Sequence, residues 1–174
     1  MSTVHVEDRA VVTAAIRLLL ERTQLIAFQY DSGFTIHFQR DLSENSSLPV
    51  QMSLVLRAHW SPAATDEIPP GLVVNQPELL HCKAEQPYQA FRIMSFVGHS
   101  VDHVDVGDDS SLTVLLSSGN MIRVAGREEE WDFSWYLFVP SDNLGVDKWS
   151  INCDAAGFID ATWPGEAPIP TKVE

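Results

Sequence analysis

Residues 26–38 read Ile-Ala-Phe-Gln-Tyr-Asp-Ser-Gly-Phe-Thr-Ile-His-Phe, and residues 104–116 read Val-Asp-Val-Gly-Asp-Asp-Ser-Ser-Leu-Thr-Val-Leu-Leu. When Ile26 is placed on Val104, the apolar positions of the two segments coincide without a gap. Three polar positions are identical: Asp31 and Asp109, Ser32 and Ser110, and Thr35 and Thr113. Alternating apolar and polar residues around a polar break are typical of a β-hairpin. The pattern therefore predicts one hairpin written twice, and hence two related β-rich halves.

The rest of the chain predicts an α+β protein with a predominantly antiparallel sheet and an N-terminal helix. Residues 7–22 place apolar side chains at three- and four-residue steps, as an amphipathic helix does, and residues 85–97 repeat this pattern more weakly. Alternating apolar residues and turn signals predict the strands. We expect them at 24–31, 33–40, 51–59, 101–106, 112–117, 120–125, 133–139, 148–153 and 158–163.

Proline and glycine mark the expected boundaries. Pro62, Pro69, Pro70 and Gly71 cannot lie in the interior of a helix or of a central strand, so residues 60–76 are expected to join the halves. The predicted units are therefore a first repeat at 1–78, which includes the helix and this junction, and a second repeat at 79–163. Residues 164–174 are expected to form an extended tail.

One strand is apolar on both sides. Phe133, Trp135, Leu137 and Val139 alternate with Ser134, Tyr136 and Phe138, which places aromatic rings on each face. A strand covered on both faces is expected near the centre of a sheet, under a helix or against a partner.

The charge balance excludes one class of partner. The chain has 24 acidic and 11 basic residues, for a net charge of −13, and the basic residues are scattered singly. Because binding to phosphate backbones needs clustered Lys and Arg, nucleic acid is not expected as a partner. A basic protein is the partner that this charge would favour.

The sequence predicts a cytoplasmic protein that has no contact with membranes. The first residues, Met-Ser-Thr-Val-His-Val-Glu-Asp, are acidic where a secretory signal would be basic, and no apolar run is long enough to span a bilayer. In that compartment Cys82 and Cys153 are expected to be reduced.

No sequence motif indicates catalysis or a cofactor. Gly-x-Ser-x-Gly and Gly-Lys-Ser/Thr are both absent, so we expect no catalytic residue and no cofactor. His99, His103 and Asp105 are the weak candidates for a metal site, since imidazole and carboxylate suit zinc, iron or manganese. Their spacing fits no helical metal motif, and surface polar residues on a strand are the plainer interpretation.

The most distinctive local composition is acidic and aromatic. It comprises the candidate partner-binding residues Glu128, Glu129, Glu130, Trp131, Asp132 and Tyr136. Carboxylates beside Trp and Tyr suit a basic partner, because aromatic residues dominate binding energy and charge steers the approach. The alternative is a solvated loop that leads into a buried strand, with Trp131 and Trp135 in the core.

The second half resembles small bacterial domains that are associated with the immunity proteins of polymorphic toxin systems. The resemblance lies in Phe96-Val97-Gly98-His99-Ser100-Val101, Val104-Asp105-Val106, Leu112-Thr113-Val114, Ser118-Gly119-Asn120 and Trp149-Ser150-Ile151. It implies a cytosolic acidic protein that binds and blocks a toxin domain, and it assigns no site residue.

These patterns lead to the hypothesis of a non-enzymatic, acidic protein-binding module, of which an immunity-like inhibitor is one form. A second hypothesis is a small-ligand binder or metal-dependent enzyme that uses a cleft between the halves. A third is a homodimer that buries the 133–139 strand between its chains.

Overall fold

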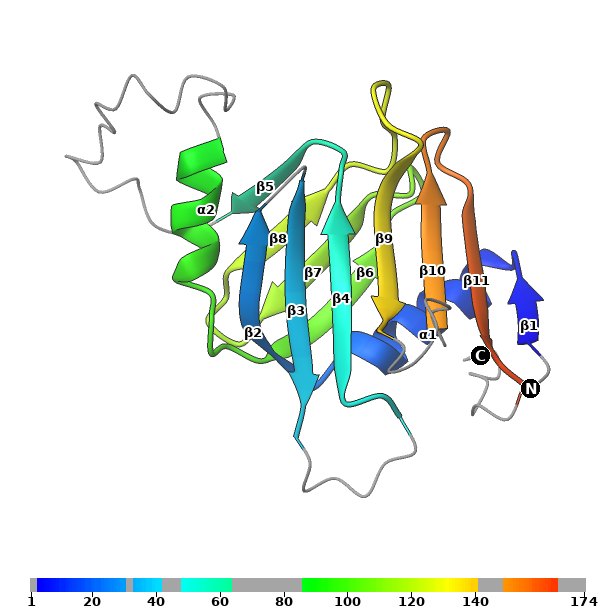
Figure 1. The fold of residues 1–174 in the computed structure, drawn as a ribbon, viewed down its shortest axis with the longest axis horizontal. Coiled ribbons are helices and arrows are strands. Elements are labelled where there is room, and N and C mark those ends of the chain that lie inside the picture. The colour runs from blue at the N-terminus through cyan, green and yellow to red at the C-terminus, as the bar shows by residue number, and fades with distance from the viewer. Residues whose placement is uncertain (1–2, 31–32, 42–47, 64–85, 141–148, 166–174) are drawn as a thin grey trace.

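The computed structural model describes residues 3–30, 33–41, 48–63, 86–140 and 149–165, and within them the chain forms two antiparallel sheets and two helices (Figure 1). The predicted class, α+β with a mainly antiparallel sheet, is confirmed. The elements are β1 (Thr3–Val6), α1 (Arg9–Leu20), β2 (Thr23–Tyr30), β3 (Phe34–Arg40), β4 (Gln51–Leu56), β5 (Trp60–Ala63), α2 (Gln86–Met94), β6 (Val101–Val106), β7 (Leu112–Leu116), β8 (Met121–Val124), β9 (Phe133–Val139), β10 (Trp149–Asp154) and β11 (Ile159–Pro164).

The larger sheet has seven strands in the order β1-β11-β10-β9-β4-β3-β2. Strand β9 is the fourth of the seven, so its predicted central position is confirmed. The inward face of the sheet carries an apolar row that crosses every strand. Successive register partners in this row are Phe28, Ile36, Leu54, Leu137, Ile151, Ala161 and Val6.

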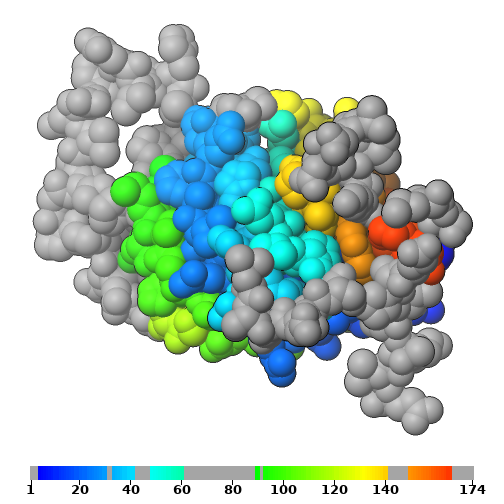
Figure 2. Space-filling model, turned by 60° about the horizontal axis from the view of Figure 1, so that its bottom comes forward, coloured from blue at the N-terminus to red at the C-terminus, as the bar shows by residue number. Residues whose placement is uncertain are grey.

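Two different elements cover this apolar row. The smaller sheet, in the order β5-β8-β7-β6, lies behind one part of the larger sheet in Figure 1, and α1 lies behind the part that contains β11. Buried residues of both sheets and of α1 form a single core. The described residues leave the opposite face of the larger sheet open. Figure 2 shows its strands side by side at the surface, from blue through cyan and gold to orange.

Helix α1 lies inside the segment 7–22, but a strand, β1, precedes it. The Asp8 carboxylate caps its start by accepting hydrogen bonds from the backbone N–H groups of Ala10 and Val11. At the other end, Arg40 Nη2 donates to the carbonyls of Leu18 and Leu19, at 2.8 and 2.9 Å. The last carbonyls of the helix are thus satisfied by a strand of the larger sheet, which fixes the helix to it.

The two similar segments, 26–38 and 104–116, both form hairpins, but their turns differ. In β2–β3 the last pair is Tyr30 and Phe34, whereas in β6–β7 it is Val106 and Leu112, so the second turn is the longer one. Each first strand also has a register shift, between Leu25 and Ala27 in β2 and between Val101 and His103 in β6.

These shifts correct the alignment of the two segments. The structure makes Ala27 equivalent to His103 and Phe28 equivalent to Val104, whereas the ungapped match pairs Phe28 with Val106. The ungapped match is therefore wrong for the first strands, because the longer turn displaces one strand relative to the other. It is consistent with the pairing only in the second strands, β3 and β7.

Both sheets combine strands from the two sides of the expected boundary between residues 78 and 79, which lies outside the described residues. Strands β1–β4 share the larger sheet with β9–β11, and β5 joins β6–β8. The expected tail at 164–174 also lies outside the described part, apart from Pro164, which ends β11, and Gly165.

Two segments differ from the sequence expectation for local reasons. The strand expected at 51–59 ends at Leu56, because the backbone N–H groups of Arg57 and Ala58 both donate to the carbonyl of Ser134 and the chain leaves the sheet. The expected junction begins with a strand, β5, which contains Pro62. A proline fits there because β5 is an edge strand of the smaller sheet.

Among the described residues, neither helix has the length and apolar character needed to cross a bilayer.

The turn at 107–111 holds the two sheets together. Ser110 adopts a left-handed φ of 64°, its Oγ donates to the carbonyl of Gly157 at 2.6 Å, and its own carbonyl accepts from the Trp135 indole at 3.0 Å. A Cβ on Gly126 would stand 2.1 Å from the carbonyl oxygen of Asp109, so this position requires glycine. The turn is thereby packed against the centre of the larger sheet.

Trp135→Phe is expected to lower the free energy of unfolding by about 2–4 kcal/mol, because it leaves the buried Ser110 carbonyl without its donor and opens a cavity. Trp131→Phe is the matched control, because Trp131 is 45% exposed and Trp135 is fully buried. Urea unfolding followed by far-UV circular dichroism measures both variants. Equal losses in the two would contradict this role of Trp135.

Candidate functional site

The acidic and aromatic residues singled out in the sequence lie in and beyond the loop between β8 and β9. The Glu128 carboxylate accepts the backbone N–H groups of Glu129 and Glu130, at 2.9 and 3.0 Å, and so shapes the loop. The backbone N–H of Glu128 donates to the backbone carbonyl of Ala155, and the backbone N–H of Ala155 donates to that of Asp132. The loop is thus fixed to the β10–β11 turn and presents Glu129, Glu130 and Asp132 to solvent.

An aromatic ridge, which we define as Trp131, Phe133, Tyr136 and Phe138, runs from this loop onto the open face of the larger sheet. The rings of Phe133 and Tyr136 are 6.0 Å apart, and those of Tyr136 and Phe138 stack at 5.4 Å with an interplanar angle of 15°. The guanidinium of Arg57 lies 4.8 Å from the Trp131 ring centroid and 5.8 Å from that of Phe133. A cation thus connects the loop end of the ridge to its sheet end.

The ridge depends on an irregularity that the sequence pattern did not reveal. Phe133 was expected on the same face as Trp135, but its ring contacts Tyr136, which alternation places on the other face. The register between β9 and β10 shifts here, because Cys153 pairs with Trp135 and Asp154 with Phe133. The bulge leaves Ser134 as the additional residue and moves Phe133 toward the open face.

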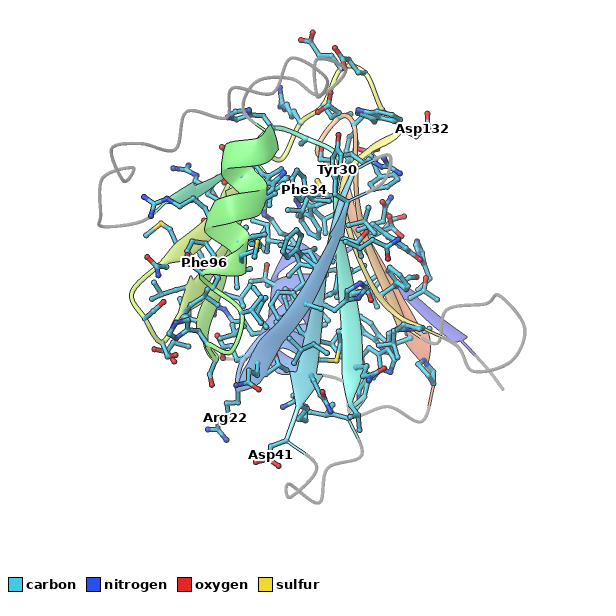
Figure 3. All side chains as sticks on the ribbon, turned by 60° about the vertical axis from the view of Figure 1, so that its left-hand side comes forward. Arg22, Tyr30, Phe34, Asp41, Phe96 and Asp132 are labelled. Carbon is cyan, nitrogen blue, oxygen red and sulfur yellow. The ribbon has the colours of Figure 1, made fainter. Side chains whose placement is uncertain are left out.

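The loop also borders a groove of about 510 Å³, which we call the acid-rimmed groove. Its ring-bearing and charged lining residues are Tyr30, Phe34, Trp60 and Trp131, Arg57 and Arg127, His59, and Glu128, Glu129 and Glu130. Tyr30 is 41% exposed, and its ring lies 4.8 Å from that of Phe34, which packs on Trp60 at 4.6 Å. In Figure 3, Tyr30, Phe34 and Asp132 lie at one end of the molecule, and Arg22 and Asp41 at the other.

The interpretation that places both Trp131 and Trp135 in the core is confirmed for Trp135 and wrong for Trp131. Trp135 is fully buried, whereas Trp131 is 45% exposed, because β9 begins only at Phe133 and Trp131 belongs to the loop. Four of the candidate residues therefore gather at the groove, namely Glu128, Glu129, Glu130 and Trp131. Tyr136 lies further along the ridge.

Sequence reasoning missed Tyr30 and Arg57 as members of this site. Tyr30 ends β2 and Arg57 directly follows β4, so a whole strand, β3, separates them in the chain. They come together because β2, β3 and β4 are neighbours in the sheet. The only sequence signal was indirect, since Tyr30 directly precedes the predicted turn at Asp31-Ser32-Gly33.

The side chains of two of the three weak metal candidates, His103 and Asp105, contact other residues. His103 Nδ1 lies 3.0 Å from Oε1 of Glu21, and Asp105 Oδ1 accepts from Arg17 Nη2 at 3.0 Å. The backbone carbonyl of His99 accepts the Leu25 N–H. Among the residues that the structure describes, no three His, Cys, Asp or Glu side chains form a metal-binding group.

A second hollow, of about 560 Å³, lies at the β1 edge of the larger sheet. There the two ring nitrogens of His5 approach Glu7 Oε1 at 3.3 Å and Thr162 Oγ1 at 3.4 Å. The His5 side chain is 55% exposed and that of Glu7 79% exposed. Both side chains are therefore largely hydrated.

Cys153 is buried in β10, and its Sγ lies 3.3 Å from the carbonyl of Gly126. Burial, with a contribution from the charge of Asp154, raises the pKa of Cys153 to about 12. Because the thiolate is the nucleophilic form of cysteine, this buried, protonated thiol is unreactive and serves as a small core side chain. Cys82 lies outside the described residues.

Comparisons with known protein families, with curated proteins and with solved structures gave no match to this chain.

Cys153 is expected to resist labelling by a thiol reagent in the native protein at pH 8, because it is buried and protonated. The measurement uses Cys82→Ser, which leaves Cys153 as the single thiol of a chain with two cysteines. Full labelling should follow only after unfolding in guanidinium chloride. Adding the exposed Ser118→Cys provides a thiol that should react at once, and rapid native labelling of Cys153 itself would contradict the assignment.

Proposed function

We propose that this protein is a non-enzymatic binding module that recognises a basic protein partner through the aromatic ridge and the acidic loop 128–132. The observation that carries the proposal is the exposure of Trp131 at the junction of the two. A large exposed aromatic ring next to a row of further rings supplies the apolar contact that dominates binding energy. The carboxylates around it supply charge complementarity to a basic surface.

The net charge of −13 extends this complementarity to long range. A strongly acidic protein attracts a basic partner before contact and raises the rate of association, an effect that salt weakens. We therefore assign the charge of Glu129, Glu130 and Asp132 to steering and orientation, and the ridge to affinity.

An immunity-like inhibitor that covers a toxin domain in the cytoplasm is the specific form of this proposal. Its support is the sequence resemblance of the second half together with the acidic charge. A wide open sheet face suits such a role, because blocking an enzyme requires covering its surface and needs no chemistry of its own.

We also infer that the hairpins β2–β3 and β6–β7 descend from one duplicated unit. The inference is supported by their matching bulges and by an antiparallel bridge between Gln24 and Ser100. These two residues occupy equivalent positions, since each directly precedes one of the matched bulge residues Leu25 and Val101. An antiparallel bridge between equivalent residues is what a twofold relation between two copies of one hairpin would produce.

The test is capture of partners by the immobilised protein, with identification of the captured proteins. Trp131→Ala combined with Tyr136→Ala is expected to reduce capture of a basic partner about tenfold or more, since two aromatic contacts are lost. The control combines Met94→Ala and Val97→Ala, which remove apolar side chains that are 61% and 41% exposed at and just after the end of α2.

Thermal unfolding of both double variants establishes that each remains folded. Light scattering of the wild-type protein identifies a homodimer, in which case the captured partner is a second copy and the proposal fails. Capture that the ridge variant retains, or that the control variant loses equally, would also contradict it.

A further inference from the structure

The open face of the larger sheet carries two rows of side chains that run side by side across five strands. On β3, β4, β9 and β10 the residue between the two rows is fully buried in the core, so alternation turns both rows outward. The register partners of the first row are Ala27, His37, Ser53, Phe138 and Ser150. Those of the second row are Gln29, Thr35, Val55, Tyr136 and Asn152.

We call these two rows the charge-free face, because they contain no Asp, Glu, Lys or Arg. The chain as a whole has 24 acidic and 11 basic residues, and such side chains are found mostly at protein surfaces. Charge returns directly beyond the face, since Asp160 on β11 pairs with Asn152 and Arg57 follows β4. The acidic loop 128–132 borders it at the end of the ridge. The missing charge is therefore a property of this face and does not reflect a general shortage.

The composition of the face makes it inexpensive to remove from water. His37 Nδ1 lies 3.0 Å from Ser53 Oγ, so two of its polar groups already contact each other across β3 and β4. Neutral polar groups lose far less free energy on leaving water than ionised groups do. A partner can therefore cover this area without leaving a buried charge unpaired.

An uncharged centre beside a charged border is the usual anatomy of a protein interface. Interface centres are depleted of charged residues and enriched in aromatic ones, and the rim is polar. A stable interface also takes roughly 20–30 residues on each side, more than the four residues of the aromatic ridge supply. The charge-free face extends the ridge to a width of about 19 Å, at about 4.8 Å for each of its four strand spacings. Figure 2 shows these strands side by side at the surface.

We propose that the partner covers the charge-free face together with the ridge, and that its contact surface is uncharged at the centre and basic along the side that meets loop 128–132. This inference rests on the proposed function and enlarges its binding surface. The charges favour a different protein over a second copy of this chain. A second copy carries the same net charge of −13, which repels the first, and offers the acidic loop no basic surface.

The test measures the affinity of the protein identified by capture for full-length variants that carry one new charge on the face. Thr35 is half-buried on β3, two strands away from the ridge strand β9. Thr35→Glu and Thr35→Lys are each expected to weaken binding about tenfold or more, since a charge of either sign would be buried without a counter-charge. The neutral variant Thr35→Gln should retain most of the affinity. Isothermal titration calorimetry measures all three.

Thr113→Glu and Thr113→Lys are the matched controls. Thr113 is the same residue at the equivalent position of the second hairpin, and it is likewise half-buried, on the smaller sheet. Both variants should bind as the wild type does. Gln29→Glu and Gln29→Lys repeat the test at an exposed position of the face, where a charge is compatible with folding, and should also weaken binding.

Salt separates the face from the acidic loop. Glu129→Lys is expected to weaken binding at low salt and to lose most of this effect in about 0.5 M NaCl, because exposed charges are screened. The losses caused by Thr35→Glu and Thr35→Lys should persist in the same salt, because buried charges are screened much less.

Affinity that the Thr35 and Gln29 variants retain would overturn the inference and leave the proposed function standing, since the ridge and the loop would then suffice. Weakening by Lys with strengthening by Glu would also overturn it, because only general charge would then matter, and so would equal losses in the Thr113 variants. A lower unfolding temperature in the Gln29 variants than in the Thr113 variants would show that the chain itself covers the face, with the same consequence. If no protein is captured, or if light scattering shows a homodimer, the proposed function and the inference both fail.

Discussion

The apolar row across the larger sheet must be covered along its whole width, and this constraint organises the rest of the molecule. No single element of a chain this short spans seven strands. The four-stranded sheet covers one part and α1 covers the part around β11, so the core is closed by two unlike layers. Trp135 lies at the centre of this arrangement, buried in the middle strand and bonded to the turn at Ser110. With one face committed in this way, the described residues leave the other face of the larger sheet uncovered.

Much of this could be predicted from local sequence. The two-sided apolar pattern of residues 133–139 predicted a central strand, and the hairpin pattern at 26–38 predicted β2 and β3. The predictions that were wrong concerned features that strand partners distant in the chain determine. The bulge opposite Cys153 turned Phe133 to the open face, and the longer turn at 107–111 shifted the match of the repeated segment. Strand β1 is too short for a periodic signal, and exists because β11 pairs with it.

The candidate site was predictable in composition and unpredictable in geometry. The acidic and aromatic composition of residues 128–131 is visible in the sequence. Their neighbours Tyr30 and Arg57 are brought to them only by the order of the strands in the sheet. The position of Trp131 was ambiguous because an aromatic residue just before a strand can point inward or outward. The residues considered for metal binding illustrate the opposite case, since His103 and Asp105 secure α1 to β6 through Glu21 and Arg17.

The pairing of β1 with β11 joins Thr3 to Pro164, almost the full length of the described chain. The central contact between β4 and β9 likewise joins distant residues, with Ser53 opposite Phe138. The chain must therefore be synthesised as far as Pro164 before the larger sheet can close, and until then some of its strand edges have no partner. Such long-range pairing slows folding and lengthens the exposure of unpaired strand edges. The nascent protein would thus benefit from chaperones more than a helical protein of equal length would.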